Sequence, residues 1–186
     1  MKKNILLIAL LSSLSFGATD ANMTQEHNVT QMGAQAIKKM MKTLNQAVMS
    51  AMKDGGAKKA ANVCADSATD IEKSVNKSFS NITIKRATLQ PRNQNNMALA
   101  DEAKMLEEMM KSNSKKLLTV KVDENNYKVF KPVYMMKKCL SCHGDETTRN
   151  KDAYAIIQAK YKNDKALGYK EGDFRGAFIA DINLSH

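Results

Sequence analysis

Two cysteines and a histidine stand within five residues of one another in the segment CLSCH, residues 139–143. A C-x-x-C pair alone can form a redox-active dithiol or half of a zinc site. A histidine directly after the second cysteine makes the pattern the attachment signature of c-type haem, in which both thiols add to the haem vinyl groups. In that arrangement Cys139 and Cys142 hold one haem covalently, and His143 ligates its iron.

The zinc and dithiol alternatives fit the rest of the chain less well. A zinc site needs two further ligands at suitable spacing, and the remaining candidates, Cys64, His27 and His186, form no partnered motif. A redox dithiol does not need the adjacent histidine. Covalent haem attachment is therefore the preferred interpretation, and we expect an acceptor group to hold His143 in one tautomer.

The first 21 residues have the composition of a secretory signal peptide. Lys2 and Lys3 precede an uncharged apolar stretch from Ile5 to about Phe16, and small residues follow. The stretch is shorter than the roughly 18 residues that favour a membrane span, and no comparable stretch occurs later. We therefore expect a periplasmic protein without a transmembrane segment in its mature chain, with residues 22–30 as a linker and residues 31–186 as a single domain.

The charge balance limits the partners. The net charge is +10, and removal of Lys2, Lys3 and Asp20 with the signal peptide leaves +9. Nucleic acid is not expected as the partner of an exported protein, so the excess favours an acidic protein or an anionic membrane surface, or serves solubility. Lysines surround the attachment segment and are candidates either for a docking surface for an acidic redox or signalling protein or for an ordinary solvated face: Lys128, Lys131, Lys137 and Lys138.

Helical patterns fill the first part of the mature chain. Apolar residues recur at helical spacing from about Gln31 to Met52, and KDGG at 53–56 ends this helix. A second apolar stripe runs from Ala57 to Val75. It places Cys64 in the middle of the apolar face.

The remaining sequence predicts a sheet with further helices. Residues 82–89 alternate β-branched and polar residues, and two strands between 116 and 135 are joined by a turn at 123–126. A helix at about 99–111, capped by Asn95 or Asn96, a helix at 152–161 and a final strand at 172–184 complete the pattern. The predicted class is α+β, an antiparallel sheet flanked by N-terminal helices.

Four motifs occur in a characteristic order: a cysteine in a helix (Cys64), RATLQPRNQNN at 86–96, CLSCHG, and GDFRGAF at 172–178. Together, over about residues 31–183, they resemble a family of exported or membrane-facing, sensor-like proteins with a PAS-like fold and one c-type haem. The resemblance implies that Cys64 is the second axial ligand of the iron, opposite His143. It also assigns Arg86, Arg92, Asn93 and Asn96 to the cofactor site, although Gln94 stands where members usually carry proline.

Other residues compete for these roles. The chain has 13 methionines, and Met135 and Met136 lie close to the attachment site in sequence, so a methionine is an alternative sixth ligand. Methionine at helical spacing is also a common core residue. His27 and His186 are further candidates for the ligand. Arg86 and Arg92 can pair with haem propionates, since a guanidinium matches a carboxylate, or they can be ordinary surface arginines.

The expected function is that of a periplasmic monohaem c-type protein that senses redox state or a small gas. Thiolate suits ferric iron, and reduction favours protonation of the sulfur, so loss of a Cys64 ligand would free a site for a gas. The alternative is a soluble periplasmic electron-transfer cytochrome without a sensing role. An enzyme is not expected, because it needs an open iron site with a distal acid or base and histidine is scarce.

Overall fold

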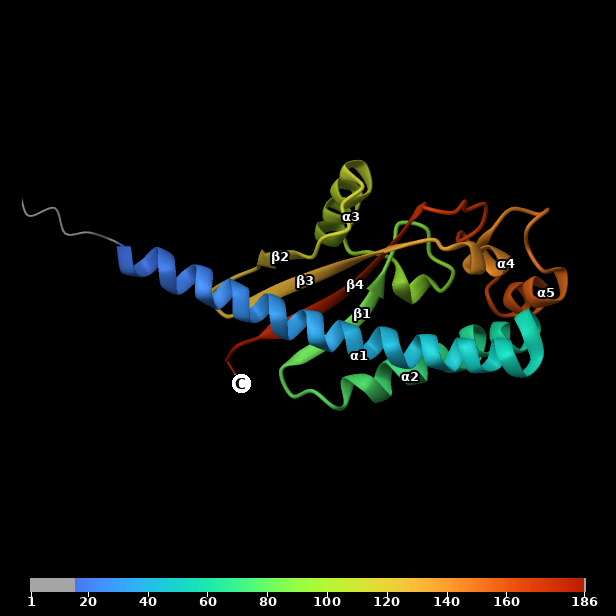
Figure 1. Cartoon of the computed structure of the whole chain (residues 1–186), viewed down its shortest axis with the longest axis horizontal. Coiled ribbons are helices and arrows are strands. Elements are labelled where there is room, and N and C mark those ends of the chain that lie inside the picture. Colours follow the sequence, from blue (N-terminus) through green and yellow to red (C-terminus); the bar gives the residue numbers. More distant parts are fainter. Residues whose placement is uncertain (1–15, 186) are drawn as a thin grey trace, which may run out of the picture.

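The structure, a computed structural model, describes residues 16–185 and contains in that range a four-stranded antiparallel sheet of order β1-β4-β3-β2. The strands are β1 (Ile82–Ala87), β2 (Leu118–Lys121), β3 (Asn126–Tyr134) and β4 (Phe174–Asn183). Helices α1 (Phe16–Asn62) and α2 (Ala68–Asn76) lie on one face of the sheet and α3 (Ala100–Ser112) on the other (Figure 1). The predicted α+β class is confirmed, and the arrangement is consistent with a PAS-like fold.

Strand β4 is the centre of the sheet, because it pairs with β1 on one side and β3 on the other. Its residues are apolar on both faces. Ala180 and Ile182 pack toward α1 and α2, whereas Ala177 and Ile179 pack toward α3. Burial on both faces explains why the sequence reads as a nearly continuous apolar run rather than as an alternation.

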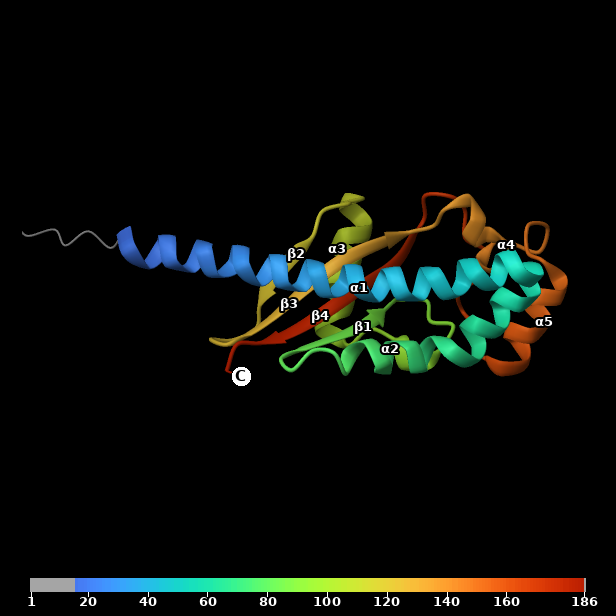
Figure 2. The same cartoon turned by 60° about the horizontal axis from the view of Figure 1, so that its bottom comes forward.

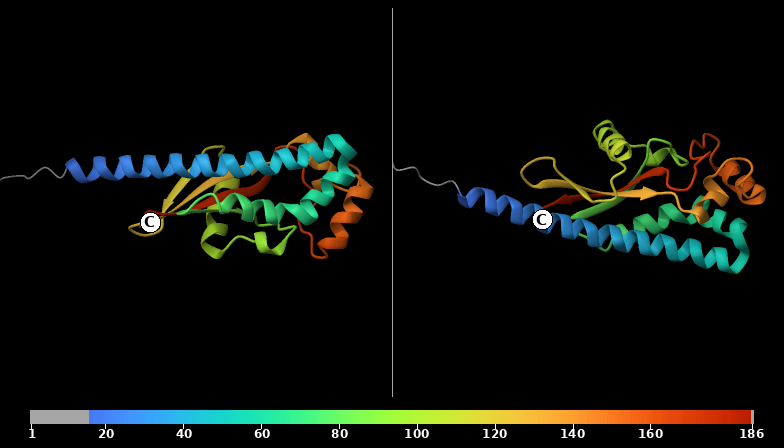
Figure 3. Two further views of the ribbon diagram at one scale, coloured as in Figure 1. Left: turned by 90° about the horizontal axis from the view of Figure 1, so that it is seen from below. Right: turned by 45° about the horizontal axis from the view of Figure 1, so that its top comes forward.

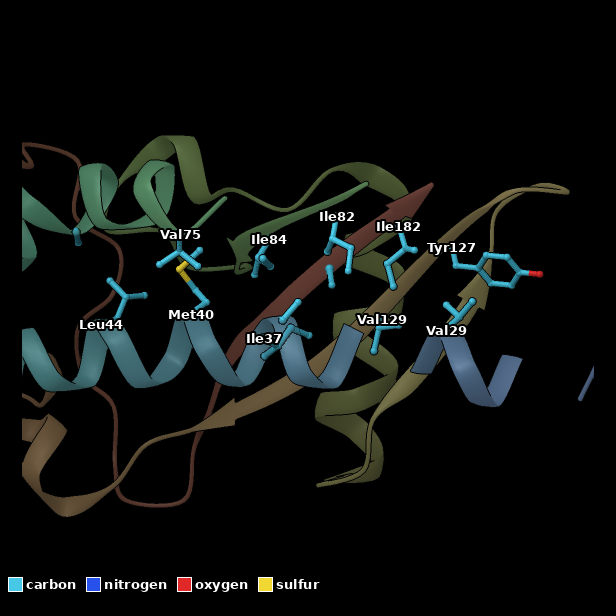
Figure 4. Close-up of a cluster of buried hydrophobic side chains, with 13 residues drawn as sticks. Val29, Ile37, Met40, Leu44, Val75, Ile82, Ile84, Tyr127, Val129 and Ile182 are labelled. Atoms are coloured by element: carbon cyan, nitrogen blue, oxygen red, sulfur yellow. The ribbon is translucent and has the colours of Figure 1, made fainter. Parts of the chain in front are cut away.

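The larger core lies between α1 and the sheet (Figure 4). Ile37, Met40 and Leu44 share one face of α1 because they are spaced by three and four residues. Each of the three is at most 9% exposed, and they pack against the isoleucines of β1 and β4. The predicted helical stripe therefore forms the main contact between α1 and the sheet.

The segment 22–30, predicted to be a linker, is instead part of α1. Val29 is 1% exposed and belongs to the core beside the sheet. The next residue, Thr30, shares a hydrogen bond of 2.6 Å between its hydroxyl and that of Thr119. These contacts extend the helix toward the N-terminus, beyond the point at which the apolar stripe becomes regular.

The N-terminal part of the expected signal peptide, residues 1–15, lies outside the described residues. Within the part of the chain that the structure describes, none of the helices combines the length and apolar character needed to cross a membrane.

The predicted helix end at 53–56 is a break within α1. Gly55 and Gly56 leave the helical conformation, and Gly56 has a φ of 65°, which glycine adopts without steric cost. The chain then turns back, completes α1 and passes into a π-helical turn, Val63–Ser67, before α2. The second predicted helix therefore consists of three pieces, with Cys64 in the middle piece.

A group of short elements lies at one end of the sheet, next to the break in α1 (Figures 2 and 3). It contains a 3₁₀ turn (Lys137–Cys139), α4 (Leu140–His143) and α5 (Lys151–Lys160). A separate 3₁₀ turn, Gln94–Asn96, follows β1. The predicted asparagine cap of α3 is wrong, because the Glu102 carboxylate accepts from the backbone N–H of Leu99 at 3.1 Å and caps the helix from within.

Candidate functional site

Cys64 and His143, far apart in the sequence, line one pocket of about 260 Å³. The pocket lies between the α1 side and the ends of β1 and β4 nearest to α4. Leu44 and Val48 of α1 form part of its wall. The other lining residues are Asn45, Ala68, Arg86, Ala87, Thr88, Asn96, Val133, Arg175, Gly176, Ala177 and Phe178.

Cys64 is presented by the π-helical turn Val63–Ser67. Such turns are rare in helices and often occur at functional sites. Burial raises the pKa of the Cys64 thiol, and the thiol of Cys142 raises it further, while Arg92 and Arg86 act in the opposite direction. A thiolate at this position therefore needs a nearby positive centre.

His143 ends α4 and is held by one hydrogen bond to its ring. Its Nδ1 lies 2.9 Å from the carbonyl oxygen of Ala166. Because a carbonyl oxygen only accepts, Nδ1 carries the proton and Nε2 keeps its lone pair. Burial, with the positive charges of Arg92 and Arg175, holds the pKa of His143 well below its ordinary value. The expectation of one fixed tautomer is confirmed, and the neutral imidazole is the form that binds a metal.

The segment 164–169 also binds the backbone around His143. The Tyr169 N–H donates to the His143 carbonyl at 3.0 Å, and the Gly168 N–H donates to the Gly144 carbonyl at 3.1 Å. Gly168 has a φ of 76°, a conformation that favours glycine. The Tyr169 ring meets the His143 ring edge-on, with 6.2 Å between the centroids. The backbone and side chain of His143 are thus held by the same segment.

Arg92 fastens this segment to the attachment motif. Its Nη2 donates to the carbonyl of Cys142 at 2.6 Å and to that of Ala166 at 3.3 Å, and its Nε pairs with the Asp164 carboxylate at 3.0 Å. Asp164 in turn accepts from the Ala166 N–H at 2.8 Å. The guanidinium, predicted to pair with a propionate, is committed to protein acceptors and orients the groups around His143.

The other residues of the RATLQPRNQNN segment have separate roles. Arg86 lines the pocket beside Cys64, and its Nε pairs with the Glu72 carboxylate at 2.9 Å. Asn96 also lines the pocket, and its carbonyl accepts from the Thr88 N–H at 3.0 Å. Asn93 is not among the lining residues. Its side chain accepts from the Asn95 N–H at 3.1 Å and so shapes the turn.

Cys139 and Cys142 are free, partly buried thiols next to this pocket. Cys139 packs against the small cluster of Met135, Ala166 and Tyr169. Cys142 packs against a cluster formed by residues of α1 and α5. This cluster includes Ala61, which comes two residues before the π-helical turn, so the motif and the turn are neighbours.

The competing ligands do not reach the pocket. Met135 is a core residue with 5% exposure, Met136 is 49% exposed, and no methionine is among the described residues that line the pocket. His27 is exposed on α1. His186 lies outside the described residues.

The predicted lysine surface is smaller than the sequence suggested. Lys128 is bonded to the carboxylates of Glu102 at 2.8 Å and Asp181 at 3.0 Å. Lys131 contacts the carbonyl of Lys115. Lys137 and Lys138 are exposed next to the attachment motif.

Arg175 is a functional candidate that the sequence reasoning missed. It lines the pocket, and its Nη1 donates to the Thr88 hydroxyl at 2.6 Å and to the Gln90 carbonyl at 3.2 Å. Its guanidinium lies 5.6 Å from the centroid of the Tyr169 ring. The signal was present, because Arg175 lies within the GDFRGAF motif.

Fold and site together define an α+β protein in which a helical cysteine and the histidine of a C-x-x-C-H motif face one pocket. The chain belongs to the Tll0287-like family, whose model matches residues 19–183. A similar solved structure is that of the cyanobacterial heme-protein Tll0287. The two structures match with a TM-score of 0.61 and 22% sequence identity, over 79% of this chain and 92% of that chain. At this identity the likeness shows a shared fold. A search of curated proteins gave no match.

Proposed function

We propose that this chain is a periplasmic monohaem c-type protein that senses redox state or a small gas, and that it is not an enzyme. The observation that carries the proposal is the pocket shared by Cys64 and His143 beside the thiols of Cys139 and Cys142. Membership of the Tll0287-like family and the fold shared with a heme-protein support it.

The donor set fits a haem. Cys139 and Cys142 would form the two thioethers, and His143 Nε2 and the Cys64 sulfur would ligate the iron. When bound, the group supplies one-electron chemistry between ferric and ferrous iron. Arg86, beside Cys64 in the pocket, supplies positive charge suited to a propionate.

The protein's own groups position the imidazole. The Ala166 carbonyl holds the Nδ1 proton, so Nε2 faces away from that hydrogen bond with its lone pair available. Arg92 and Asp164 fix the Ala166 peptide from both sides. This arrangement would keep the orientation of His143 toward a bound iron constant.

Of the two proposed ligands, Cys64 would be released more easily than His143. Because burial raises the pKa of its thiol, the anionic sulfur depends on positive charge in the pocket. Reduction of a bound iron would lower that charge and favour the thiol. Release of Cys64 would open one side of the pocket, which is lined there by apolar residues such as Leu44 and Val48. A site that opens on reduction distinguishes a sensor from a carrier.

A second candidate function is electron transfer between soluble proteins. Lys137 and Lys138, exposed next to Cys139, favour this alternative because they can dock an acidic partner close to the cofactor edge.

Optical spectra of the ferric and ferrous protein, recorded with and without carbon monoxide, test the proposal. We expect a low-spin ferric spectrum and a ferrous spectrum that changes when carbon monoxide is added. A ferrous spectrum that carbon monoxide leaves unchanged would favour the carrier. Absence of a covalent haem spectrum would refute both functions.

Export is tested by cell fractionation. The protein should be found in the periplasmic fraction without its first 21 residues. Retention of the full-length chain in the cytoplasm would contradict the proposed location.

A further inference from the structure

A second pocket, of about 420 Å³, lies next to the candidate haem site. It shares Thr88 and Arg175 with the pocket of Cys64 and His143. Its other lining residues are Leu89, Gln90, Met110, Leu167, Gly168, Tyr169, Asp173 and Phe174. Arg175 therefore stands between two separate spaces.

Two opposite charges line the second pocket without forming an ion pair. Between residues 16 and 185, neither Arg175 nor Asp173 makes a salt bridge. Asp173 accepts from the backbone N–H of Lys170 at 2.7 Å, and Arg175 donates to the Thr88 hydroxyl and the Gln90 carbonyl. Within that range, neither side chain thus has a counter-charge at ion-pair distance, although the Asp164 carboxylate acts on Arg175 from farther away.

The spacing of these charges matches a small zwitterion. Asp173 directly precedes β4 and Arg175 is the second residue of that strand, so their backbones are separated by at most roughly 7 Å. Both residues line the same pocket. A carboxylate bound to Arg175 and an ammonium group bound to Asp173 can therefore belong to one short molecule.

The rest of the pocket is suited to an apolar group. Leu89, Met110, Leu167 and Phe174 contribute to its lining, and Met110 is 45% exposed. Covering these side chains would remove apolar surface from water. We propose that the second pocket binds an α-amino acid with an apolar side chain, with its carboxylate on Arg175 and its ammonium group on Asp173.

Such a ligand would be coupled to His143. The segment Leu167–Tyr169 forms one wall of the pocket, and its N–H groups donate to the carbonyls of Gly144 and His143. The preceding residue, Ala166, accepts the ring hydrogen bond of His143. A ligand that contacts this wall changes the position of the imidazole and hence the reduction potential. This coupling rests on the proposed function, whereas binding itself does not.

Isothermal titration calorimetry on the ferric holoprotein tests binding. The probes are L-leucine, L-methionine and L-phenylalanine, with 4-methylpentanoate and 3-methylbutylamine as leucine analogues that lack one charge. We expect at least one of the amino acids to bind, and the two analogues to bind about tenfold or more weakly than leucine, because each lacks one of the two charged contacts. Failure of all three amino acids to bind, or equal binding of 4-methylpentanoate and leucine, would overturn the proposal.

Three variants locate the site. Asp173→Asn should remove the preference for leucine over 4-methylpentanoate, and Arg175→Gln should abolish binding of both. Glu171→Gln is the matched control, because Glu171 is an exposed acid close to Asp173 that does not line the pocket. If Asp173→Asn keeps the full preference for leucine, the ammonium group is not bound there and the proposal fails.

A redox titration with and without saturating L-leucine tests the coupling. The wild-type potential should shift on saturation, and the Arg175→Gln potential should not, because that variant no longer binds leucine. Leucine binding without any shift would refute the coupling to His143. A normal covalent haem spectrum without leucine binding would refute the second pocket and leave the proposed function intact.

Discussion

Asp164 and Glu102 are both buried carboxylates paired with cations, but they lie in different parts of the molecule. Asp164, with its side chain 2% exposed, pairs with Arg92 at the end of the sheet that carries the attachment motif. Glu102 is a fully buried residue of α3 and pairs with Lys85 at 2.6 Å and Lys128 at 2.8 Å. Both carboxylates form buried ion pairs, but the two ion pairs connect different parts of the protein.

The Glu102 cluster connects a helix to the sheet. It caps α3 through Leu99 and joins lysines of β1 and β3, so it fixes how α3 packs. The Asp164–Arg92 pair instead connects backbone carbonyls that surround His143. A buried ion pair can therefore serve packing in one place and ligand orientation in another, and the groups bonded around it show which.

The largest expected effect concerns the end of the sheet that carries the attachment motif. Replacing both Cys139 and Cys142 with Ala should abolish covalent attachment, because these are the two vinyl-reactive thiols. Haem staining of a denaturing gel measures it, and Cys64→Ala is the control that should retain the stain. Stain retained by the double variant would contradict the assignment.

Glu102→Gln should affect stability and leave the site unchanged. Removing one partner of a buried ion pair leaves lysines without a counter-charge, and we expect a loss of about 3 kcal/mol in the free energy of unfolding. Denaturant titration measures it, with Asp101→Asn as an exposed neighbouring control whose effect should be small. A changed ferric spectrum in Glu102→Gln would show that the two regions are coupled.

Cys64→Ala should raise the reduction potential and alter the ferric spectrum, because a thiolate stabilises ferric iron. We expect a rise on the order of 0.1 V, within the roughly 0.8 V that axial ligands span. Redox titration measures it, and Ser67→Ala in the same π-helical turn is the control. If potential and spectrum match the wild type, Cys64 is a core residue.

Arg92→Gln should lower the potential and keep the haem attached. Loss of a positive charge near the iron favours the ferric state, by on the order of 50 mV for a charge about 10 Å away in a partly screened medium. Arg86→Gln is the paired variant, since Arg86 lines the pocket and Arg92 orients His143. An unchanged potential in both variants would place their charges outside the influence of the iron.

The smallest expected effect is a pH dependence on the α3 side. Despite burial, hydrogen bonds from Lys128, Lys85 and the Leu99 N–H lower the pKa of Glu102 below its ordinary value of 4.5. Its contribution to stability is therefore present above pH 4.5 and is lost as the pH falls through the lowered pKa. Below pH 4.5, the free energy of unfolding should fall more steeply with decreasing pH in the wild type than in Glu102→Gln. Equal slopes would show that Glu102 does not carry this dependence.

Local patterns predicted part of this structure. The spacing of Ile37, Met40 and Leu44 predicted their shared buried face, and the C-x-x-C-H motif predicted how His143 would be held. The strands followed from their β-branched residues and turns. In these cases the interacting residues are close in sequence, or their types are specific for one kind of site or element.

Contacts between distant segments were not predictable in the same way. For Arg92 the sequence left a propionate partner and a surface position open, and no local pattern marks Asp164 or the carbonyls of Cys142 and Ala166 as its partners. The role of residues 22–30 was missed because Val29 alone does not reveal an apolar stripe. The cap of α3 was missed because a glutamate inside the helix replaced the expected asparagine.

Helix α1 touches the candidate site at one end and extends along the sheet away from it (Figure 3). Val48 lines the pocket, and the helix continues without a break from there back to Asn22, the first residue after the proposed signal peptide, about 39 Å away at 1.5 Å per residue. A tilt of about 5° at Val48 would displace Asn22 by about 3 Å. Because the helix is long and unbroken, a small rearrangement beside Cys64 would be amplified into a larger movement at its N-terminal end.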